Sequence, residues 1–173
     1  MTVWRHVRAV ALLPFMVAIV VPGLLVSFIE THVGWELPPA LWALPFLIAA
    51  SLIASGLVLF GWTVRLFAGA GQGTLAPWDP TQRLVVAGPY RHVRNPMISG
   101  VLAVLLGEAA LFGSWPLFVW FLVFLALNQV YIPLSEEPGM ERRFGEEYRR
   151  YARNVPRWLP RLRPSEPEGD GSR

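Results

Sequence analysis

The stretch Gly88-Pro-Tyr-Arg-His-Val-Arg-Asn-Pro-Met-Ile-Ser-Gly100 decides the fold, because a polar, arginine-bearing turn runs there directly into an apolar helix. Asn95-Pro96 marks the junction, since proline starts a helix readily but is not tolerated in its interior. The free backbone N–H groups of such a helix start, together with nearby arginines, make a site for an anionic group. The remaining sequence places this site at a membrane surface.

Composition assigns the chain to the integral membrane proteins. Of its 173 residues, 54% are hydrophobic and only 16% are charged, which is typical of that class. There is no cysteine and no histidine cluster with metal-site spacing, so we expect no disulfide, no thiol chemistry and no metal ion. Arginine at the ends of apolar runs is explained by membrane orientation and anionic lipid, and we expect no nucleic-acid partner.

Four apolar runs predict transmembrane helices, at about 10–29, 39–64, 97–112 and 115–134. The last two form one run whose only charge is Glu108, too long for a single crossing of a hydrocarbon core of about 30 Å. Gly113-Ser114 with Pro116 breaks this run, so we predict a tight antiparallel hairpin. A secretory signal peptide is the competing interpretation of the first run.

Beyond the last predicted span, the sequence changes character. Aromatic and apolar side chains at 140, 144, 148 and 151 recur at helical spacing and predict a cytoplasmic amphipathic helix at about 137–152. Residues 165–173 are polar and predict a disordered tail. We therefore expect an all-α integral membrane protein in which residues 1–164 form a single domain with about four transmembrane helices.

The distribution of arginine predicts the orientation of this multi-pass protein in the cell membrane. In a four-span arrangement, the arginines fall on the side that holds both chain termini and the loop from Gly69 to Asn95, or at helix ends that face this side. By the positive-inside rule, that side is cytoplasmic. The arrangement gathers Arg65, the Gly88 turn and Glu136-Glu137 on one face, where they can form a single site.

Each of these charged groups has a functional and a structural interpretation. Two adjacent carboxylates at 136 and 137 suit an ammonium group or ribose hydroxyls, or they simply end a span. The cluster of Arg91, His92 and Arg94 suits an anion, or it serves orientation and lipid binding. Arg65 suits a substrate carboxylate or phosphate, or it reaches lipid phosphate. The residues alone leave these alternatives open.

Taken in order, several pieces of the sequence resemble the isoprenylcysteine carboxyl methyltransferase and phospholipid methyltransferase group of integral membrane enzymes. They are Gly-Pro-Tyr-Arg-His-Val-Arg-Asn-Pro-Met at 88–97, the glutamate pair at 136–137, Phe-Gly-Glu-Glu-Tyr-Arg-Arg-Tyr at 144–151, and Val-Pro-Arg at 155–157. The similarity covers roughly residues 62–164. Each piece is short, and the specificity comes from their order.

The resemblance implies an enzyme that binds S-adenosylmethionine at the cytoplasmic face and methylates a lipophilic acceptor, at a carboxylate or a headgroup, that reaches it from the bilayer. Arg65 resembles the arginine that family members place beside the acceptor's carboxylate. Carried over by position, the cofactor-binding residues are Tyr90, Arg94, Asn95, Pro96, Gly100, Glu136, Glu137, Tyr148, Tyr151 and Arg157.

The sequence departs from the family pattern at two positions. Asn95 stands where many members have histidine, and Ile98 stands where a tyrosine is common. Asparagine keeps one donor and one acceptor in place of an imidazole, whereas isoleucine offers neither. Two other function classes stay open: a membrane reductase that uses a nicotinamide cofactor, and a non-catalytic scaffold whose arginines bind anionic lipid headgroups. The sequence does not determine the acceptor, O- versus N-methylation, the oligomeric state or a protein partner.

Overall fold

The computed structural model describes residues 13–29, 34–35, 37–70 and 84–163, and within these ranges it contains helices and irregular segments but no strand. The α-helices are α2 (Val21–Phe28), α3 (Ala43–Ala70), α4 (Pro96–Phe112), α5 (Trp115–Tyr131), α6 (Glu137–Phe144) and α7 (Glu146–Asn154). π-Helical turns cover Met16–Val20 and Ile132–Glu136, and 3₁₀ turns cover Pro39–Leu41 and Gly88–Arg91. The predicted tail at 165–173 lies outside the described residues.

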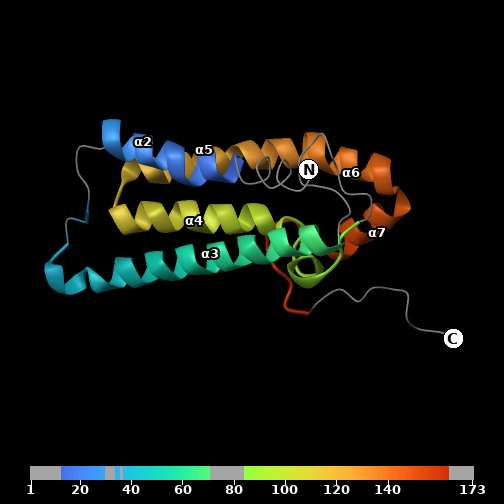
Figure 1. Cartoon of the computed structure of the whole chain (residues 1–173), viewed down its shortest axis with the longest axis horizontal. Coiled ribbons are helices and arrows are strands. Elements are labelled where there is room, and N and C mark those ends of the chain that lie inside the picture. The colour runs from blue at the N-terminus through green and yellow to red at the C-terminus, as the bar shows by residue number, and fades with distance from the viewer. Residues whose placement is uncertain (1–12, 30–33, 36, 71–83, 164–173) are drawn as a thin grey trace.

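The long helices run side by side along one axis (Figure 1). α3 packs against α4, α4 against α5, and α2 against α5. The Trp120 indole of α5 donates to the Val17 carbonyl beside α2, 3.0 Å away. The end of α3, the start of α4 and the end of α5 meet at one end of this bundle, where α6 and α7 also lie (Figure 1). That end holds the residues singled out from the sequence.

Among the described residues, two helical stretches are long and apolar enough to cross a membrane. They are Ala43–Leu66, with a mean hydropathy of 2.3, and Trp115–Phe144, with a mean hydropathy of 2.0. The other two apolar helices, Leu13–Phe28 and Pro96–Phe112, are shorter. Large apolar side chains such as Phe46, Trp115 and Leu134 are more than half exposed on the bundle. Such a surface suits lipid rather than water, so the apolar helices associate with a membrane.

α3 and α4 approach closely because small residues line their contact. A Cβ on Gly56 would lie 2.6 Å from the Gly100 carbonyl oxygen, and a Cβ on Gly107 would lie 2.7 Å from Ile53 Cγ1. Gly100 and Gly107 are seven residues apart on α4, and Ala49 precedes Gly56 by seven on α3. This spacing keeps one face of each helix toward the other, and small residues there allow the backbones to touch.

The second predicted span has different bounds in the structure. The sequence predicted a helix at about 39–64, but α3 begins at Ala43 and continues to Ala70. Proline is tolerated in the first turn of a helix, so Pro45 lies within α3 while Pro39 belongs to the preceding 3₁₀ turn. The charge of Arg65 does not end the helix as predicted. A long arginine side chain can reach the membrane interface while its backbone stays helical.

The boundary between the fourth span and the amphipathic helix also differs. We predicted that the span ends at 134 and that one helix covers about 137–152. Instead, helical structure runs without a break from Trp115 to Phe144, passing through the π turn at Ile132–Glu136. The predicted amphipathic helix is split at Gly145 into α6 and α7. Glu136-Glu137 therefore lie inside a continuous helix rather than at its end.

The chain reverses direction at Gly145, which has φ +54° and ψ −126°. As a result, α7 turns back from the end of α6 (Figure 1), and Met140 and Phe144 still pack against Tyr148 and Tyr151. The shared face predicted from helical spacing is thus assembled by a turn rather than by one helix.

Replacing Gly145 with alanine is expected to destabilise the protein by about 1–3 kcal/mol, because side-chain-bearing residues rarely adopt its backbone conformation. Gly139→Ala is the matched control, since Gly139 lies inside α6 with open space around it. That variant should be neutral or gain up to about 1 kcal/mol from helix propensity. Thermal unfolding in detergent measures both, and equal stability of the two variants would contradict the assigned role of the turn.

Candidate active site

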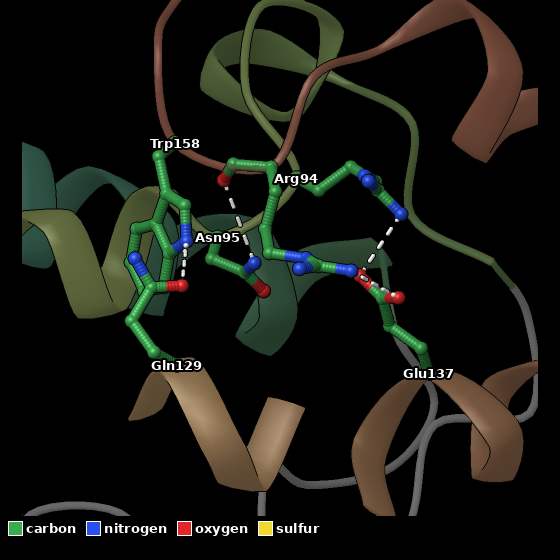
Figure 2. A network of polar contacts seen from close by, with 6 residues as sticks. Arg94, Asn95, Gln129, Glu137 and Trp158 are labelled. Carbon is green, nitrogen blue, oxygen red and sulfur yellow. Dashed lines mark hydrogen bonds and ion pairs between the residues drawn. The ribbon is translucent and has the colours of Figure 1, made fainter. Parts of the chain in front are cut away.

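Glu137 is the centre of a three-residue ion-pair cluster, which we call the carboxylate clamp. Its Oε1 accepts hydrogen bonds from Arg94 Nη1 at 2.9 Å and Arg157 Nε at 2.8 Å, and its Oε2 accepts one from Arg157 Nη2 at 2.7 Å. Figure 2 shows Arg94 and Glu137 pointing toward each other. The two-bond arrangement with Arg157 is the geometry that makes arginine–carboxylate pairs strong and specific.

Burial strengthens the carboxylate clamp relative to an ordinary surface ion pair. The side chains of Arg94, Glu137 and Arg157 are 15%, 19% and 30% exposed. Partial removal from water reduces solvent screening of their attraction. The hydrogen bonds that Arg157 donates to Glu137 raise the pKa of the Arg157 guanidinium, so this group stays charged. The clamp joins the turn before α4, the start of α6 and the segment after α7.

The turn before α4 is held in place from two sides. Gly88 lies against α3, where a Cβ would come within 3.0 Å of Leu66 Cδ1 and 3.2 Å of Trp62 Nε1. The turn ends in α4, for which Pro96 supplies a buried first residue, and Ser99 N donates to the Asn95 carbonyl at 3.0 Å. As the sequence predicted, a rigid arginine-bearing turn leads into the helix at Pro96.

The segment after α7, residues 155–161, runs along this turn. Arg94 N donates to the Pro156 carbonyl at 2.9 Å, and Arg161 N donates to the His92 carbonyl at 3.0 Å. A His92 ring nitrogen lies 2.8 Å from the Arg161 carbonyl oxygen, to which it donates. Asn95 Nδ2 lies 3.5 Å from the Arg157 carbonyl oxygen, a long contact.

Tryptophan fastens the same segment to α5. Trp158 Nε1 donates to Gln129 Oε1 at 2.9 Å (Figure 2). Both residues lie far from the motif at 88–100 in the sequence. Indole offers a single donor and therefore needs an acceptor near it, which the glutamine supplies. The start of α4 and the end of α5 are thus joined through one extended segment.

Three buried tyrosines, Tyr90, Tyr148 and Tyr151, lie beside the carboxylate clamp. Tyr151 donates from its hydroxyl to the Tyr90 carbonyl at 2.9 Å, and the rings of Tyr148 and Tyr151 are 6.2 Å apart. Burial is the main cause that raises the pKa of all three phenols, and the charge of Glu137 raises the pKa of Tyr148 further. At neutral pH these tyrosines are therefore neutral hydrogen-bonding groups rather than bases.

A pocket of about 370 Å³ opens beside the carboxylate clamp. Its size is within the range of small-molecule sites in proteins, and it presents both signs of charge. The Nε of Arg94 is buried and has no hydrogen-bond partner among the described residues. The lining residues are Arg94, Pro133, Glu137, Pro138, Glu141, Tyr148, Arg149, Ala152 and Arg153.

The outer wall of the pocket is built from exposed ion pairs. Arg149 donates to Glu141 Oε1 at 2.6 Å and to Glu146 Oε2 at 3.3 Å, and Arg153 donates to Glu146 Oε1 at 2.9 Å. These side chains are about half exposed or more. Exposed pairs of this kind contribute roughly 1 kcal/mol or less. A bound molecule can therefore displace them without a large loss.

The structure brings most of the residues predicted for the site to one place. Arg94, Glu137 and Tyr148 line the pocket. Glu136 is exposed, and its charge contributes to the raised pKa of Tyr90 and Tyr148. Arg157 and Tyr151 contact two of the lining residues, Glu137 and Tyr148. Asn95 and Tyr90 in turn contact Arg157 and Tyr151.

Three predicted residues take other positions. Pro96 is buried at the start of α4, and Gly100 lies in the α3–α4 contact rather than in the pocket lining. Arg65 is exposed on α3 and forms none of the bonds of the carboxylate clamp. The segment that carries it adjoins the Gly88 turn through its neighbour Leu66.

Several residues that build the site were not identified from the sequence, although a spacing of four would have found some of them. On the α5–α6 helix, Pro133, Glu137 and Glu141 follow one another at this spacing and all line the pocket. Arg149 and Arg153 do the same on α7. By contrast, the sequence gives no signal that Trp158 bonds to Gln129.

The comparisons with known proteins identify the family of the chain. The model of the phospholipid methyltransferase family matches residues 44–147, a region that runs from the start of α3 to the first residues of α7 and includes Arg65, Arg94 and Glu137. No curated protein and no solved structure matches the chain. Because the family model covers more than half of the 173 residues, the chain belongs to the phospholipid methyltransferase family of membrane methyltransferases.

Proposed function

We propose that the protein transfers a methyl group from S-adenosylmethionine to a lipophilic acceptor at the cytoplasmic face of the cell membrane. One observation carries this proposal: the carboxylate clamp joins the motif before α4 to the glutamate at the start of α6, beside a pocket of about 370 Å³. Family membership supports methyl transfer. The cofactor and the class of acceptor are the finer parts that we infer.

The proposed arrangement has four membrane crossings within a single domain of residues 1–164. The last two form a hairpin through Gly113 and Ser114, where Ser114 Oγ caps α5 by accepting from Leu117 N at 3.3 Å. α4, with 17 residues, is about 26 Å long, so the bilayer adapts to it or its start lies in the interface. Positive-inside orientation then makes both termini and the pocket cytoplasmic.

The charges around the pocket fit S-adenosylmethionine. Its amino-acid part carries an ammonium and a carboxylate, and the lining offers glutamates and arginines for both. Arg94 Nε is a buried donor that lacks a partner among the described residues, as expected for a group that binds an anionic oxygen. A carboxylate has about four acceptor sites. The two arginines fill three of these acceptor sites on Glu137, which leaves one for the ammonium. We propose that Glu141, the other glutamate in the lining, also accepts a hydrogen bond from the ammonium.

S-adenosylmethionine supplies a methyl group that its sulfonium has already activated. The protein then has to align the acceptor and exclude water. Tyr148 offers an aromatic face beside the clamp, which suits a cationic or aromatic ligand. We propose that Tyr90, Tyr151 and the segment at 155–161 enclose the site, and that Asn95 and Pro96 fix the start of α4. A carboxylate acceptor needs no strong base, whereas an amine must first lose a proton.

The experiment that tests the proposal incubates the purified protein in lipid nanodiscs with methyl-labelled S-adenosylmethionine and a total lipid extract. We expect label to appear in a lipid fraction and S-adenosylmethionine to bind saturably by calorimetry. Saturable binding of a nicotinamide cofactor without S-adenosylmethionine binding would instead establish the reductase. Binding of neither, with salt-sensitive lipid association, would establish a scaffold.

Replacing Arg65 with alanine separates acceptor binding from cofactor binding. Arg65 lies on α3 outside the carboxylate clamp, and we propose that it holds an anionic group of the acceptor. Arg65→Ala should leave S-adenosylmethionine affinity unchanged and lower turnover on a carboxylate lipid about tenfold to a hundredfold, because a charge-assisted hydrogen bond contributes about 1.5–3 kcal/mol. Full residual turnover would exclude this role.

A further inference from the structure

The last described residues, 158–163, carry two leucines that nothing in the described part of the chain covers. Leu159 is 81% exposed and Leu162 is 99% exposed. Arg161 and Arg163 flank Leu162, so cationic and apolar side chains alternate over the last three residues of the segment. A single exposed leucine is ordinary on a protein surface. Two on one short segment, interleaved with arginine, match the composition of segments that lie in a membrane interface.

The bonds of this segment place it at the end of the membrane helices. Trp158 is bonded to Gln129, two residues before the end of α5, and Arg161 is bonded to His92, four residues before α4 begins. Gln129 lies in α5 and His92 lies just before α4, and we propose that both helices cross the membrane. In Figure 1, the segment leaves the bundle at the end of α3 and α4 and points away from it. This step rests on the proposed crossings: with α4 and α5 in the membrane, Leu159 and Leu162 lie close to a leaflet surface.

We propose that residues 158–163 dock on the anionic surface of the cytoplasmic leaflet. In this arrangement Leu159 and Leu162 enter the boundary between headgroups and acyl chains, while Arg161 and Arg163 face lipid phosphates. The charge pattern favours lipid over a second copy of the chain, because pairing two copies would bring like-charged arginines together. The docking surface is separate from the pocket, none of whose lining residues belongs to the segment.

The absence of cysteine from the chain allows a clean test with one labelled site. We would attach an environment-sensitive nitrobenzoxadiazole dye to Leu162→Cys and measure its quenching by doxyl-labelled lipid in nanodiscs. One set of nanodiscs contains phosphatidylcholine only, and the other adds phosphatidylglycerol. We expect stronger quenching and blue-shifted emission in the anionic nanodiscs, with partial reversal at high salt. Glu147→Cys is the matched control, because Glu147 is exposed and belongs to α7 rather than to the segment, and its dye should stay unquenched.

A charge variant tests the part assigned to arginine. Arg161 also donates to the Asn154 carbonyl, so its replacement would disturb the fold. Arg163 is exposed and takes part in none of the hydrogen bonds given above. Arg163→Gln should weaken docking about fivefold in anionic nanodiscs, since one arginine near such a surface contributes about 1 kcal/mol. An unquenched dye at 162 in anionic nanodiscs would overturn the proposal. Equal quenching in both lipids would overturn the anionic preference, and emission that shifts with protein concentration in detergent would assign the surface to a second copy.

Discussion

Glu137→Gln is expected to lower the affinity for S-adenosylmethionine by about tenfold or more and to destabilise the protein by about 2–4 kcal/mol. Glutamine keeps the size of the side chain but removes the charge that holds both Arg94 and Arg157. It leaves two partly buried guanidinium groups without their counter-ion. Removing one member of a buried ion-pair cluster costs more stability than replacing the whole cluster with apolar side chains, because the remaining charges stay desolvated and lack a counter-ion.

The same prediction separates a structural role of the carboxylate clamp from a role in binding. In the double variant Glu137→Gln with Arg157→Gln, one uncompensated charge has been removed, so part of the lost stability should return. The affinity for S-adenosylmethionine should not return, because the pocket still lacks a carboxylate that lines it. Thermal unfolding and calorimetry in detergent measure the two quantities on the same preparations.

A matched control and a contrary outcome complete the experiment. Glu147→Gln removes an exposed carboxylate from α7 that takes no part in the clamp, and it should change neither quantity. If Glu137→Gln lost stability but bound S-adenosylmethionine normally once folded, the clamp would only fasten three segments together. The cofactor would then have to bind elsewhere, and the proposed pocket would be wrong.

The meeting of the Gly88 turn with the end of α5 could be predicted, because proline and glycine mark where the helices start and where the chain turns. Pro96 starts α4 as its position predicted, and the Gly88 turn precedes it. Once the helices on either side of Gly113 are placed, the start of α4 and the end of α5 must lie at the same end of the bundle. Arg94 and Glu137 are 43 residues apart in sequence, yet Arg94 Nη1 lies 2.9 Å from Glu137 Oε1. The fold of the chain between them accounts for this contact.

The partners within the site could not be predicted in the same way. The family resemblance implies that Glu137 faces the cofactor. It gives no indication that the same carboxylate accepts hydrogen bonds from two arginines. Which charge meets which depends on side-chain directions at the ends of three elements, and helical spacing does not determine these. The turn at Gly145 was missed for a related reason. One glycine inside an amphipathic pattern is compatible with a continuous helix. The reversal brings Tyr148 and Tyr151 of α7 against Met140 and Phe144 of α6, a contact between helices that local spacing does not predict.

Gly56→Ala is expected to push α3 and α4 apart, because its added methyl group would lie 2.6 Å from the Gly100 carbonyl oxygen and 2.9 Å from Val104 Cγ2. Backbone cannot move aside as a flexible side chain can, so α3 and α4 must separate. We expect a loss of about 1–3 kcal/mol. Gly61→Ala is the matched control on the same helix, since none of the described residues comes within 4 Å of the methyl group it would add. It should be neutral or gain up to about 1 kcal/mol.

Gly100→Ala then decides how this glycine contributes to the site. Its added methyl group would meet the Gly56 carbonyl oxygen at 2.9 Å and Phe60 N at 3.2 Å, so its loss of stability should match that of Gly56→Ala. Gly100 lies one turn after Pro96, and pushing α4 away from α3 there would shift the start of α4. If Gly100 acts only through this packing, both variants should lose S-adenosylmethionine affinity in proportion to stability. A loss of affinity confined to Gly100→Ala would instead mean that the cofactor touches this glycine, as the family resemblance implies.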